Sequence, residues 1–395
     1  MSARRPALDI AVAGGGMVGA ACALALARCG FAVALLEARE PAHWRADDPE
    51  DLRVIALAPS SARLLDELGV WPAIKAARVS PYHQMRVWDA ASGAEIAFDA
   101  ASEGCAQLGW IVENKLVASV LWSALDGAGV RRLCPAHVES FAVRDNRVTL
   151  DLADGATLST ALLVIADGAR SRLRKQAGIA VRGRDYHQRA VVAHVATERA
   201  HQATAWQRFT REGPIALLPL ADGRSSIVWS LPDARAREVL ALDDEGFCAA
   251  TGVASDFRLG SVTATTPRAS FPLKLQLAQT YATDRCVLLG DAAHAVHPLA
   301  GQGANLGLRD VAELASVLGD ARAAGRDFAA PHVLQRYARR RRAAAALDAR
   351  AFDSIERLFA RQSPGWTALR GIGIRAVDAF GPLKRRLSAH AAGRA

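Results

Sequence analysis

The sequence predicts an α/β fold in which a mostly parallel, Rossmann-like domain carries an inserted, mainly antiparallel β domain and a C-terminal helical segment. Residues 8–36 read as strand, helix and strand, and short alternating strands dominate residues 186–262. After residue 311 the apolar spacing is helical nearly to the end. Buried parallel strands are continuous apolar runs, whereas antiparallel strands alternate, so the architecture changes between these regions.

Composition and charge narrow the class of protein. The 395 residues are 51% hydrophobic and 23% charged, which suits a globular chain of two domains or one large composite domain. The net charge of +9 is compatible with nucleic acid, a membrane surface or an anionic ligand as partner. No nucleic-acid-binding motif accompanies the charge, so we expect no nucleic-acid partner.

Cysteines and apolar runs set the expected compartment. The six cysteines are scattered with no metal-binding spacing, which favours free thiols in a reducing, cytoplasmic compartment and predicts no metal. Ile10–Leu36 is apolar enough to resemble a signal peptide or a membrane span, but Gly14–Gly16 and Arg28 interrupt it. No other stretch is long and apolar enough to span a bilayer, so we expect any membrane contact to be peripheral.

A glycine-rich turn joins the first strand and helix, and an acid follows the second strand. Gly14 permits the tight turn, Gly16 lets the backbone approach a pyrophosphate, and Gly19 lets helix and strand pack closely. Glu37, 18 residues after Gly19, would accept hydrogen bonds from ribose hydroxyls and disfavours a 2′-phosphate. The alternative is a glycine turn kept for packing alone. The pattern predicts a bound dinucleotide, either NAD or FAD.

Two further Gly/Asp elements follow apolar strands. Asp167 and Gly168 come after 162–165, and Asp291 follows a strand that begins at Cys286 and precedes a glycine-rich turn. Ligands of open α/β sheets bind at the carboxyl ends of the strands, so these acids are binding candidates. Asp167 alone could equally cap a turn.

Other expected elements follow from period and turn residues. We expect helices at 60–68, 111–125, 233–251, 312–323, 331–361 and 365–387. We expect strands at 85–89, 95–98, 131–133, 138–144, 147–152, 190–196, 215–220, 225–230 and 257–262. Arg339–Arg342 covers every side of its helix, which indicates either a solvated face or a patch for anionic lipid or an acidic partner.

Several motifs occur in the order found in class A flavoprotein monooxygenases: GGGMVG…LLEAR, DLRVIALAPSS, IVEN, IADGARSRLR and GDAAHAVHPLAGQGANLGLRD. HPLAGQGANLGL, RVIALAPSS and GPLKRRL most resemble the ubiquinone-biosynthesis hydroxylase family (UbiH/UbiF/VisC type). The resemblance covers essentially the whole chain. It implies an aromatic-hydroxylase fold with a discontinuous FAD-binding domain at 1–75, 110–182 and 278–330, substrate-domain segments at 76–109 and 183–277, and C-terminal helices at 331–395.

The resemblance implies FAD contacts position by position. The three glycines of the first turn would face the pyrophosphate, and Glu37, with Arg39 beside it, would bind the adenosine ribose. Arg53 and Asn114 would reach the pyrophosphate and ribityl region. On the residues alone, Arg53 could equally be a surface ion pair. Asp167 belongs to the element linked in this class to both FAD and NAD(P)H binding.

The resemblance divides the Cys286–Val311 segment into two roles. Asp291 would hold a ribityl hydroxyl, and backbone N–H groups at the start of the following helix would stabilise negative charge on the reduced ring. His294 is expected to be structural. His297 is a candidate at the flavin edge. The residues expected to wrap the isoalloxazine edge are Pro298, Gly301, Gln302, Gly303 and Asn305.

The implied reaction uses NAD(P)H and O2 to hydroxylate the aromatic ring of a ubiquinone precursor, a polyprenyl phenol or quinol, through a flavin C4a-hydroperoxide. The pocket should be apolar to exclude water, and Leu218 and Trp229 lie on candidate lining strands. Tyr186, His187 and His194 are candidate bases for the phenol, each with an ordinary structural alternative.

Other functions stay open at this point. A related hydroxylase could act on a small soluble aromatic, and a non-catalytic flavin-binding protein would have a similar fold. The leading hypothesis is a cytoplasmic enzyme with peripheral contact at the inner face of the membrane, or assembly with other ubiquinone-biosynthesis proteins.

Overall fold

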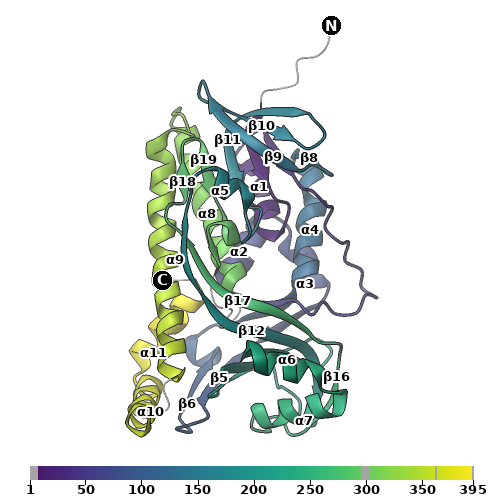
Figure 1. Cartoon of the computed structure of the whole chain (residues 1–395), viewed down its shortest axis with the longest axis vertical. Helices are drawn as coiled ribbons and strands as arrows, with labels where there is room; N and C mark the ends of the chain where they lie inside the picture. The colour runs from purple at the N-terminus through teal and green to yellow at the C-terminus, as the bar shows by residue number, and fades with distance from the viewer. Residues whose placement is uncertain (1–7, 296–301, 361–362, 394–395) are drawn as a thin grey trace.

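The computed structural model describes residues 8–295, 302–360 and 363–393, and two large sheets organise it (Figure 1). The first sheet has eight strands in the order β18-β19-β11-β1-β2-β8, with β10 paired to β11 and β9 to β10. Its strands are β1 (Leu8–Ala13), β2 (Val33–Leu36), β8 (Arg131–Leu133), β9 (Val138–Arg144), β10 (Arg147–Leu152), β11 (Thr157–Ile165), β18 (Ala282–Thr283) and β19 (Cys286–Leu288).

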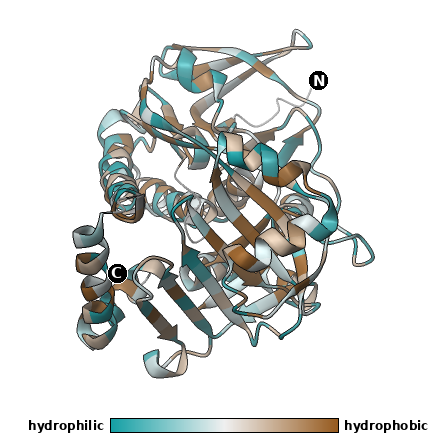
Figure 2. Cartoon of the chain, turned by 60° about the horizontal axis from the view of Figure 1, so that its bottom comes forward, coloured by the Kyte–Doolittle hydropathy of each residue, from teal (hydrophilic) through white to brown (hydrophobic). Residues whose placement is uncertain are grey.

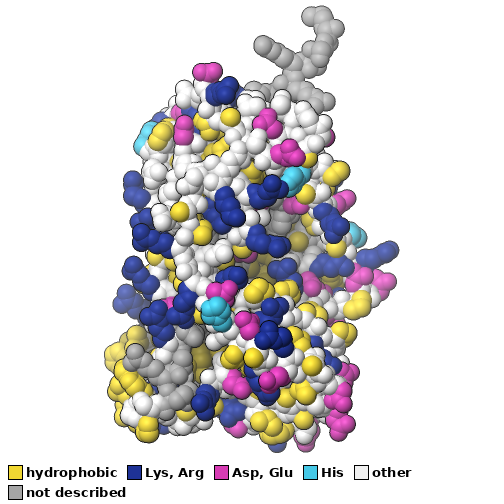
Figure 3. Space-filling model, viewed as in Figure 1, with side chains coloured by type: hydrophobic (Ala, Val, Ile, Leu, Met, Phe, Trp, Pro, Cys, Tyr) yellow, Lys and Arg dark blue, Asp and Glu magenta, His cyan; other side chains and the backbone are white. Residues whose placement is uncertain are grey.

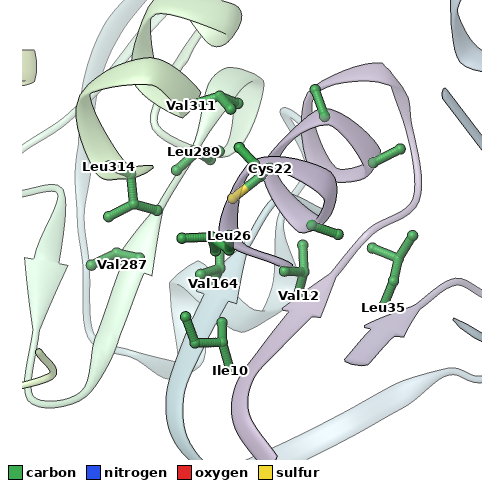
Figure 4. Packing of buried hydrophobic residues seen from close by; sticks show 14 of the residues in the cluster. Ile10, Val12, Cys22, Leu26, Leu35, Val164, Val287, Leu289, Val311 and Leu314 are labelled. Carbon is green, nitrogen blue, oxygen red and sulfur yellow. The ribbon is translucent and has the colours of Figure 1, made fainter. Parts of the chain in front are cut away.

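The centre of this sheet is parallel and fully apolar. β1 pairs in parallel with β11 and β2, and β11 pairs in parallel with β19. Helix α1 (Met17–Arg28) packs against α4 (Asn114–Gly127) and α8 (Gln302–Ala323). Figure 4 shows Cys22 and Leu26 of α1 among side chains from the strands and from α8. Short helix α5 (Arg172–Gln176) follows β11.

The second sheet has nine strands and is mainly antiparallel. Its order is β20-β17-β12-β15-β14-β13-β5-β6, with β16 on β12. Its strands are β5 (Gln84–Asp89), β6 (Glu95–Asp99), β12 (Val181–Thr197), β13 (Thr204–Phe209), β14 (Pro214–Pro219), β15 (Ser225–Pro232), β16 (Val262–Thr265), β17 (Ala269–Ala278) and β20 (His294–Ala295). Helices α6 (Asp233–Ala241) and α7 (Asp244–Ala254) lie below it in Figure 1.

The strands of a small third sheet are interleaved in sequence with those of the other two. This sheet pairs β7 (Gly109–Glu113) with β3 (Val54–Leu57) and β4 (Val79–Tyr82), all antiparallel. Helices α2 (Pro59–Glu67) and α3 (Trp71–Ala76) and the 3-10 turns η1 (Ala101–Glu103) and η2 (Gly290–Ala292) complete this part.

Three helices close the chain. α9 (Pro331–Ala360) runs along the left edge in Figure 1, and α10 (Pro364–Ala379) and α11 (Gly381–Ala391) lie at its lower end. Throughout the described ranges, none of the helices has both the length and the apolar character needed to cross a bilayer.

The predicted fold class is confirmed, while four element predictions were wrong in detail. The helix expected at 365–387 is two helices, divided at Phe380. The helix expected at 111–125 begins only at Asn114, because 109–113 are the central strand of the third sheet. Periodicity cannot separate a short apolar strand from the helix that follows it directly. The expected helix 233–251 is two helices, and 257–262 turns before a strand begins at Val262.

Candidate active site

Three strands far apart in sequence end side by side. Ala13 of β1 is paired with Ile165 of β11, and Ile165 with Leu288 of β19. Because the strands are parallel, the turns that follow them meet at one edge of the sheet. The structure therefore brings together the Gly14 turn, Asp167 and Asp291, as the three Gly/Asp elements predict.

The glycines of the first turn meet different surroundings. A Cβ at Gly19 would lie 1.9 Å from the Gly14 carbonyl oxygen, and one at Gly14, whose φ is +109°, would lie 2.4 Å from the Ala166 oxygen. A Cβ at Gly16 would have nothing within 4 Å. Gly14 and Gly19 thus serve the packing of helix and strands, whereas Gly16 opens onto free space at the N-terminus of α1. An anion such as a pyrophosphate fits there, against free backbone N–H groups.

Glu37 reaches back to the same turn. Its carboxylate accepts hydrogen bonds from the Gly15 backbone N–H at 2.5 Å and from the Arg39 backbone N–H at 3.1 Å. The side chain is half-buried at the end of β2, and the Arg39 side chain is exposed. The acid is therefore held beside the open glycine turn.

Arg53 and Asn114 are brought together by strand pairing. β3 and β7 are paired next to these residues, and the Asn114 backbone N–H donates to the Arg53 carbonyl at 2.9 Å. Buried Glu113 holds this corner by accepting from the backbone N–H of Asp51 at 2.7 Å and from Arg78 at 2.8 Å. The Arg53 guanidinium lies 5.6 Å from the centre of the Phe271 ring.

A cavity of about 1000 Å³ lies beside these residues. Arg53 and Asn114 line it beside the third sheet, and Asp291 lines it at the edge of the parallel sheet. Asp291 has exposed surface in this cavity but protein on its other sides, and desolvation raises the pKa of its carboxyl above the ordinary value, partly opposed by His294 and Arg53. Asp167 is exposed at the neighbouring strand end, and Arg170, two residues after Gly168, also lines the cavity.

The wall opposite belongs to the antiparallel sheet, and on β14 and β15 alternate residues line the cavity. Leu218 lines the cavity, together with other apolar residues that include Met85, Phe98, Val192, Ala216, Val228 and Phe271. Trp229 does not, because it lies in the core on the other face of the sheet with Leu217 and Ile227. The prediction for this strand was off by one residue, since Val228 and Ser230 are the lining positions.

The expected flavin-edge residues are only partly described. Pro298, Gly301 and His297 lie outside the described residues, as does the side chain of Gln302. A Cβ at Gly303, in the first turn of α8, would meet nothing within 4 Å. Asn305 is buried, and its side chain accepts from the Ala58 backbone N–H and the Ser61 hydroxyl, both at 2.8 Å, while donating to Ala56. Asn305 therefore joins α8 to the β3–α2 turn.

His294 belongs to a buried ionic network. Its Nε2 lies 2.6 Å from Oδ2 of Asp310, and Arg341 donates to Oδ1 of the same carboxylate at 2.6 Å. Asp310 also accepts from the Gly290 backbone N–H at 3.0 Å. Burial disfavours the charged imidazole, but the Asp310 carboxylate outweighs it and raises the pKa of His294. The network fixes the Gly290 turn, which agrees with the structural role expected for His294.

Among the described residues that line the cavity, none is one of the three candidate bases. Tyr186 is buried under the Arg184 guanidinium, His187 is exposed, and His194 is buried with Nε2 3.2 Å from the Asp51 carbonyl. Burial lowers the pKa of His194, so it is neutral at physiological pH. Tyr82 does line the cavity, and burial raises its pKa to about 12. It is a neutral hydroxyl there.

The site also has contributors that sequence reasoning missed. Phe271 of β17 and the α11 residues Leu387 and Ala391 line the cavity. The apolar spacing of Leu383 and Leu387 gave a signal for a helix face, but nothing local indicated which surface it covers. An open glycine turn, an acid at the end of the second strand and an aspartate at a cavity edge fit an extended dinucleotide that carries a ring. This fold and site define a flavoprotein of the aromatic-hydroxylase class.

Comparisons with known proteins agree with this class. A family model described as an FAD binding domain matches residues 7–350. The 3-demethoxyubiquinol 3-hydroxylase of Escherichia coli (strain K12) is 38% identical over 386 residues, 98% of each chain. The mitochondrial ubiquinone biosynthesis monooxygenase COQ6 of Xenopus tropicalis is 37% identical over 449 residues, covering 99% of this chain and 95% of that one.

A solved structure shows the same fold. PqsL of P. aeruginosa, in complex with 2-aminobenzoylacetate, has a TM-score of 0.77 at 23% identity over 93% of this chain and 99% of its own. The chain belongs to the FAD-binding family and, with its relatives above 30% identity, to the monooxygenases of ubiquinone biosynthesis. It is an FAD-dependent aromatic-ring monooxygenase.

Proposed function

We propose that this enzyme hydroxylates the aromatic ring of a polyprenylated ubiquinone precursor, using NAD(P)H and O2. The observation that supports this most is the two-sided cavity. On one side lie Asp291, at the edge of the parallel sheet, and Arg53 and Asn114, beside the third sheet, while on the other side the nine-stranded sheet presents apolar side chains. A ring held between these walls would face a cofactor at the sheet edge in surroundings that exclude water.

We further propose how the chain's own residues hold FAD. Gly16 and the N-terminus of α1 would hold the pyrophosphate, Glu37 the adenosine ribose, and Asp291 the ribityl chain. Bound FAD supplies electron transfer from NAD(P)H and the activation of O2. Backbone N–H groups at the start of α8 would face the ring, where Gly303 leaves room for its approach.

The apolar wall would position the substrate and keep water away. Leu218, Val228 and Phe271 offer contact surface for a ring, while the Tyr82 hydroxyl is available for a hydrogen bond to its oxygen. Because Tyr82 stays protonated, it would orient the substrate phenol or quinol rather than deprotonate it. A related reaction on a small soluble aromatic is the alternative.

Accumulated precursor would test the substrate class. We expect deletion of the gene to lower ubiquinone and to accumulate a prenylated precursor that lacks one ring oxygen, identified by mass spectrometry. Restoring the wild-type gene should clear the precursor, whereas an Asp291→Ala copy should not. An unchanged ubiquinone pool with no intermediate would refute the proposal and favour a soluble substrate.

A further inference from the structure

Helix α10 is amphipathic in the opposite sense to an ordinary surface helix. It buries Arg370, which is 3% exposed, and leaves Leu369 and Ile372 58% and 60% exposed. The Arg370 guanidinium binds the buried carboxylate of Asp89 through two contacts, of 2.9 and 3.0 Å. Trp366 lies on the same exposed stripe and is 40% exposed. The helix is thus attached to the protein by a charged pair and presents its apolar stripe outward.

Helix α11 repeats this arrangement. Its Ser388 is buried and donates to Glu103, and Lys384 pairs with Asp378 at 2.7 Å. Its apolar residues Leu383 and Leu387 face outward and are 40% and 47% exposed, and Phe380, which precedes the helix, is 58% exposed. Figure 3 shows hydrophobic side chains gathered at the lower left, where Figure 1 places these two helices. Hydropathy colouring also shows apolar positions along this helical pair in Figure 2. We call the six exposed residues the apolar face: Trp366, Leu369, Ile372, Phe380, Leu383 and Leu387.

The exposed arginines and one paired acid make the two helices themselves basic. Arg375, Arg385 and Arg386 are exposed on the same two helices. The only acid between residues 364 and 391 is Asp378, which is paired with Lys384. A second copy of the chain, docked symmetrically on this face, would bring like charges together. An anionic phospholipid surface would instead pair with the arginines while accepting the apolar side chains.

The apolar face also reaches the active-site cavity. Leu387 is both an exposed member of the face and a lining residue of the cavity, and Ala391, one turn later, is likewise exposed and lining. An apolar surface and the cavity are therefore continuous along α11. A substrate that lies in a bilayer could enter here without its tail crossing water.

We propose that the apolar face of α10 and α11 docks on an anionic phospholipid bilayer, with the cavity mouth beside α11 turned toward the lipid. The helices lie in the interface and do not span it. Docking stands on the exposed residues alone, whereas delivery of a prenylated substrate through this mouth rests on the proposed function.

Vesicle binding tests the docking without any substrate. FAD-loaded protein should sediment with vesicles of phosphatidylcholine and phosphatidylglycerol, and much less with phosphatidylcholine alone. Leu369→Ser/Ile372→Ser should weaken binding by at least about tenfold. The matched control is Leu242→Ser/Val253→Ser, which removes exposed apolar residues of the antiparallel domain and should bind as wild type. Equal binding by both double variants would overturn the proposal.

The exposed arginines of α11 can be tested in the same way, with a second double variant and its matched control. Arg385→Glu/Arg386→Glu should weaken binding by about fivefold or more for each charge removed. Arg336→Glu/Arg339→Glu on α9, where the arginine-rich run lies, should have a smaller effect. A larger effect on α9 would place the docking surface there instead. Notably, Arg341 of that run is buried against Asp310 and faces no lipid.

Two further measurements distinguish a lipid surface from a second copy of the chain as the partner of the apolar face. Lipids brominated in the acyl chains should quench wild-type fluorescence more than that of Trp366→Phe, because Trp366 would lie at the lipid boundary. Light scattering without lipid should give the same mass for wild type and Leu369→Ser/Ile372→Ser; a smaller mass for the variant would show that a second copy covers the face, and would refute lipid docking.

Activity separates docking from the proposed function. Leu369→Ser/Ile372→Ser should lose NAD(P)H oxidation with a long-chain prenyl phenol in vesicles but keep it with a short-chain, water-soluble analogue. If neither substrate stimulates the wild type, the proposed function fails while the sedimentation result still decides docking. Equal activity of the variant on both substrates would refute entry through this mouth.

Discussion

The parallel and antiparallel sheets form two walls of one cavity, and they do so by different rules. On the parallel sheet, the candidate binding residues come immediately after strands, at Gly14, Asp167 and Asp291, and of these Asp291 lines the cavity. On the antiparallel sheet the lining residues lie within strands, and every second residue faces away into a separate core. Which residues form the first wall depends on where the parallel strands end, and which form the second depends on the register of the antiparallel strands. Moving a substitution by one residue therefore has different consequences on the two walls.

The largest effect should come from two glycines three residues apart on the parallel side. Gly19→Ala should destabilise the protein by about 3 kcal/mol or more, because its Cβ would overlap the Gly14 carbonyl. Gly16→Ala, with open space around its Cβ, should leave apoprotein stability within about 0.5 kcal/mol and weaken FAD binding. Thermal unfolding of the apoprotein and flavin titration measure the two. Equal destabilisation by both would contradict separate packing and binding roles.

Neighbouring leucines make the corresponding test on the antiparallel side. Leu217→Ala should cost about 2–5 kcal/mol of stability, because this side chain is buried in the core beyond the sheet. Leu218→Ala should cost less stability and raise the KM for the aromatic substrate, since it faces the cavity. Denaturant unfolding and steady-state kinetics distinguish them. A KM effect confined to Leu217 would reverse the assigned faces.

Asp291 and His294 lie in the same turn but are expected to have different roles. Asp291 would bind FAD, whereas His294 stabilises the turn through Asp310. Asp291→Ala should weaken FAD binding by about tenfold to a hundredfold, the loss of a charge-assisted hydrogen bond. His294→Ala should keep the bound flavin and its yellow colour but unfold at lower temperature, because it leaves Asp310 with one fewer partner. Flavin absorbance after gel filtration reads out the first, and calorimetry the second. Loss of flavin from His294→Ala alone would overturn the assignment.

The smallest expected effect is a pH dependence of the same network. Because its pKa is raised in the folded state, His294 contributes stability that is complete below its ordinary pKa, about 6.5, and is lost as pH rises through the raised value. The groups that act on it are Asp310, Arg341 and Asp291. Wild type should lose up to about 1.4 kcal/mol per pH unit in that window relative to His294→Gln. If the stability of wild type and that of His294→Gln changed equally with pH, the His294–Asp310 pair would not titrate in this window.

What could be predicted from the sequence follows the same division. The positions of Gly14, Glu37 and Asp291 at the ends of parallel strands could be predicted, because strand ends, glycines and acids are local signals in the sequence. Trp229 was misplaced because alternation gives two faces but does not say which one meets the cavity. The strand 109–113 was missed because its apolar residues run directly into a helix. The buried Arg370 could not be foreseen, since its partner Asp89 is 281 residues away.

The place of α11 in the chain has a consequence for the order in which the enzyme is assembled. Every strand that lines the cavity is synthesised before Gly381, and α11 then adds Leu387 and Ala391 as the last piece of wall. The residues proposed to hold FAD are likewise complete before α11 emerges. A nascent or clipped chain that lacks this helix would therefore have a cavity open to water on one side.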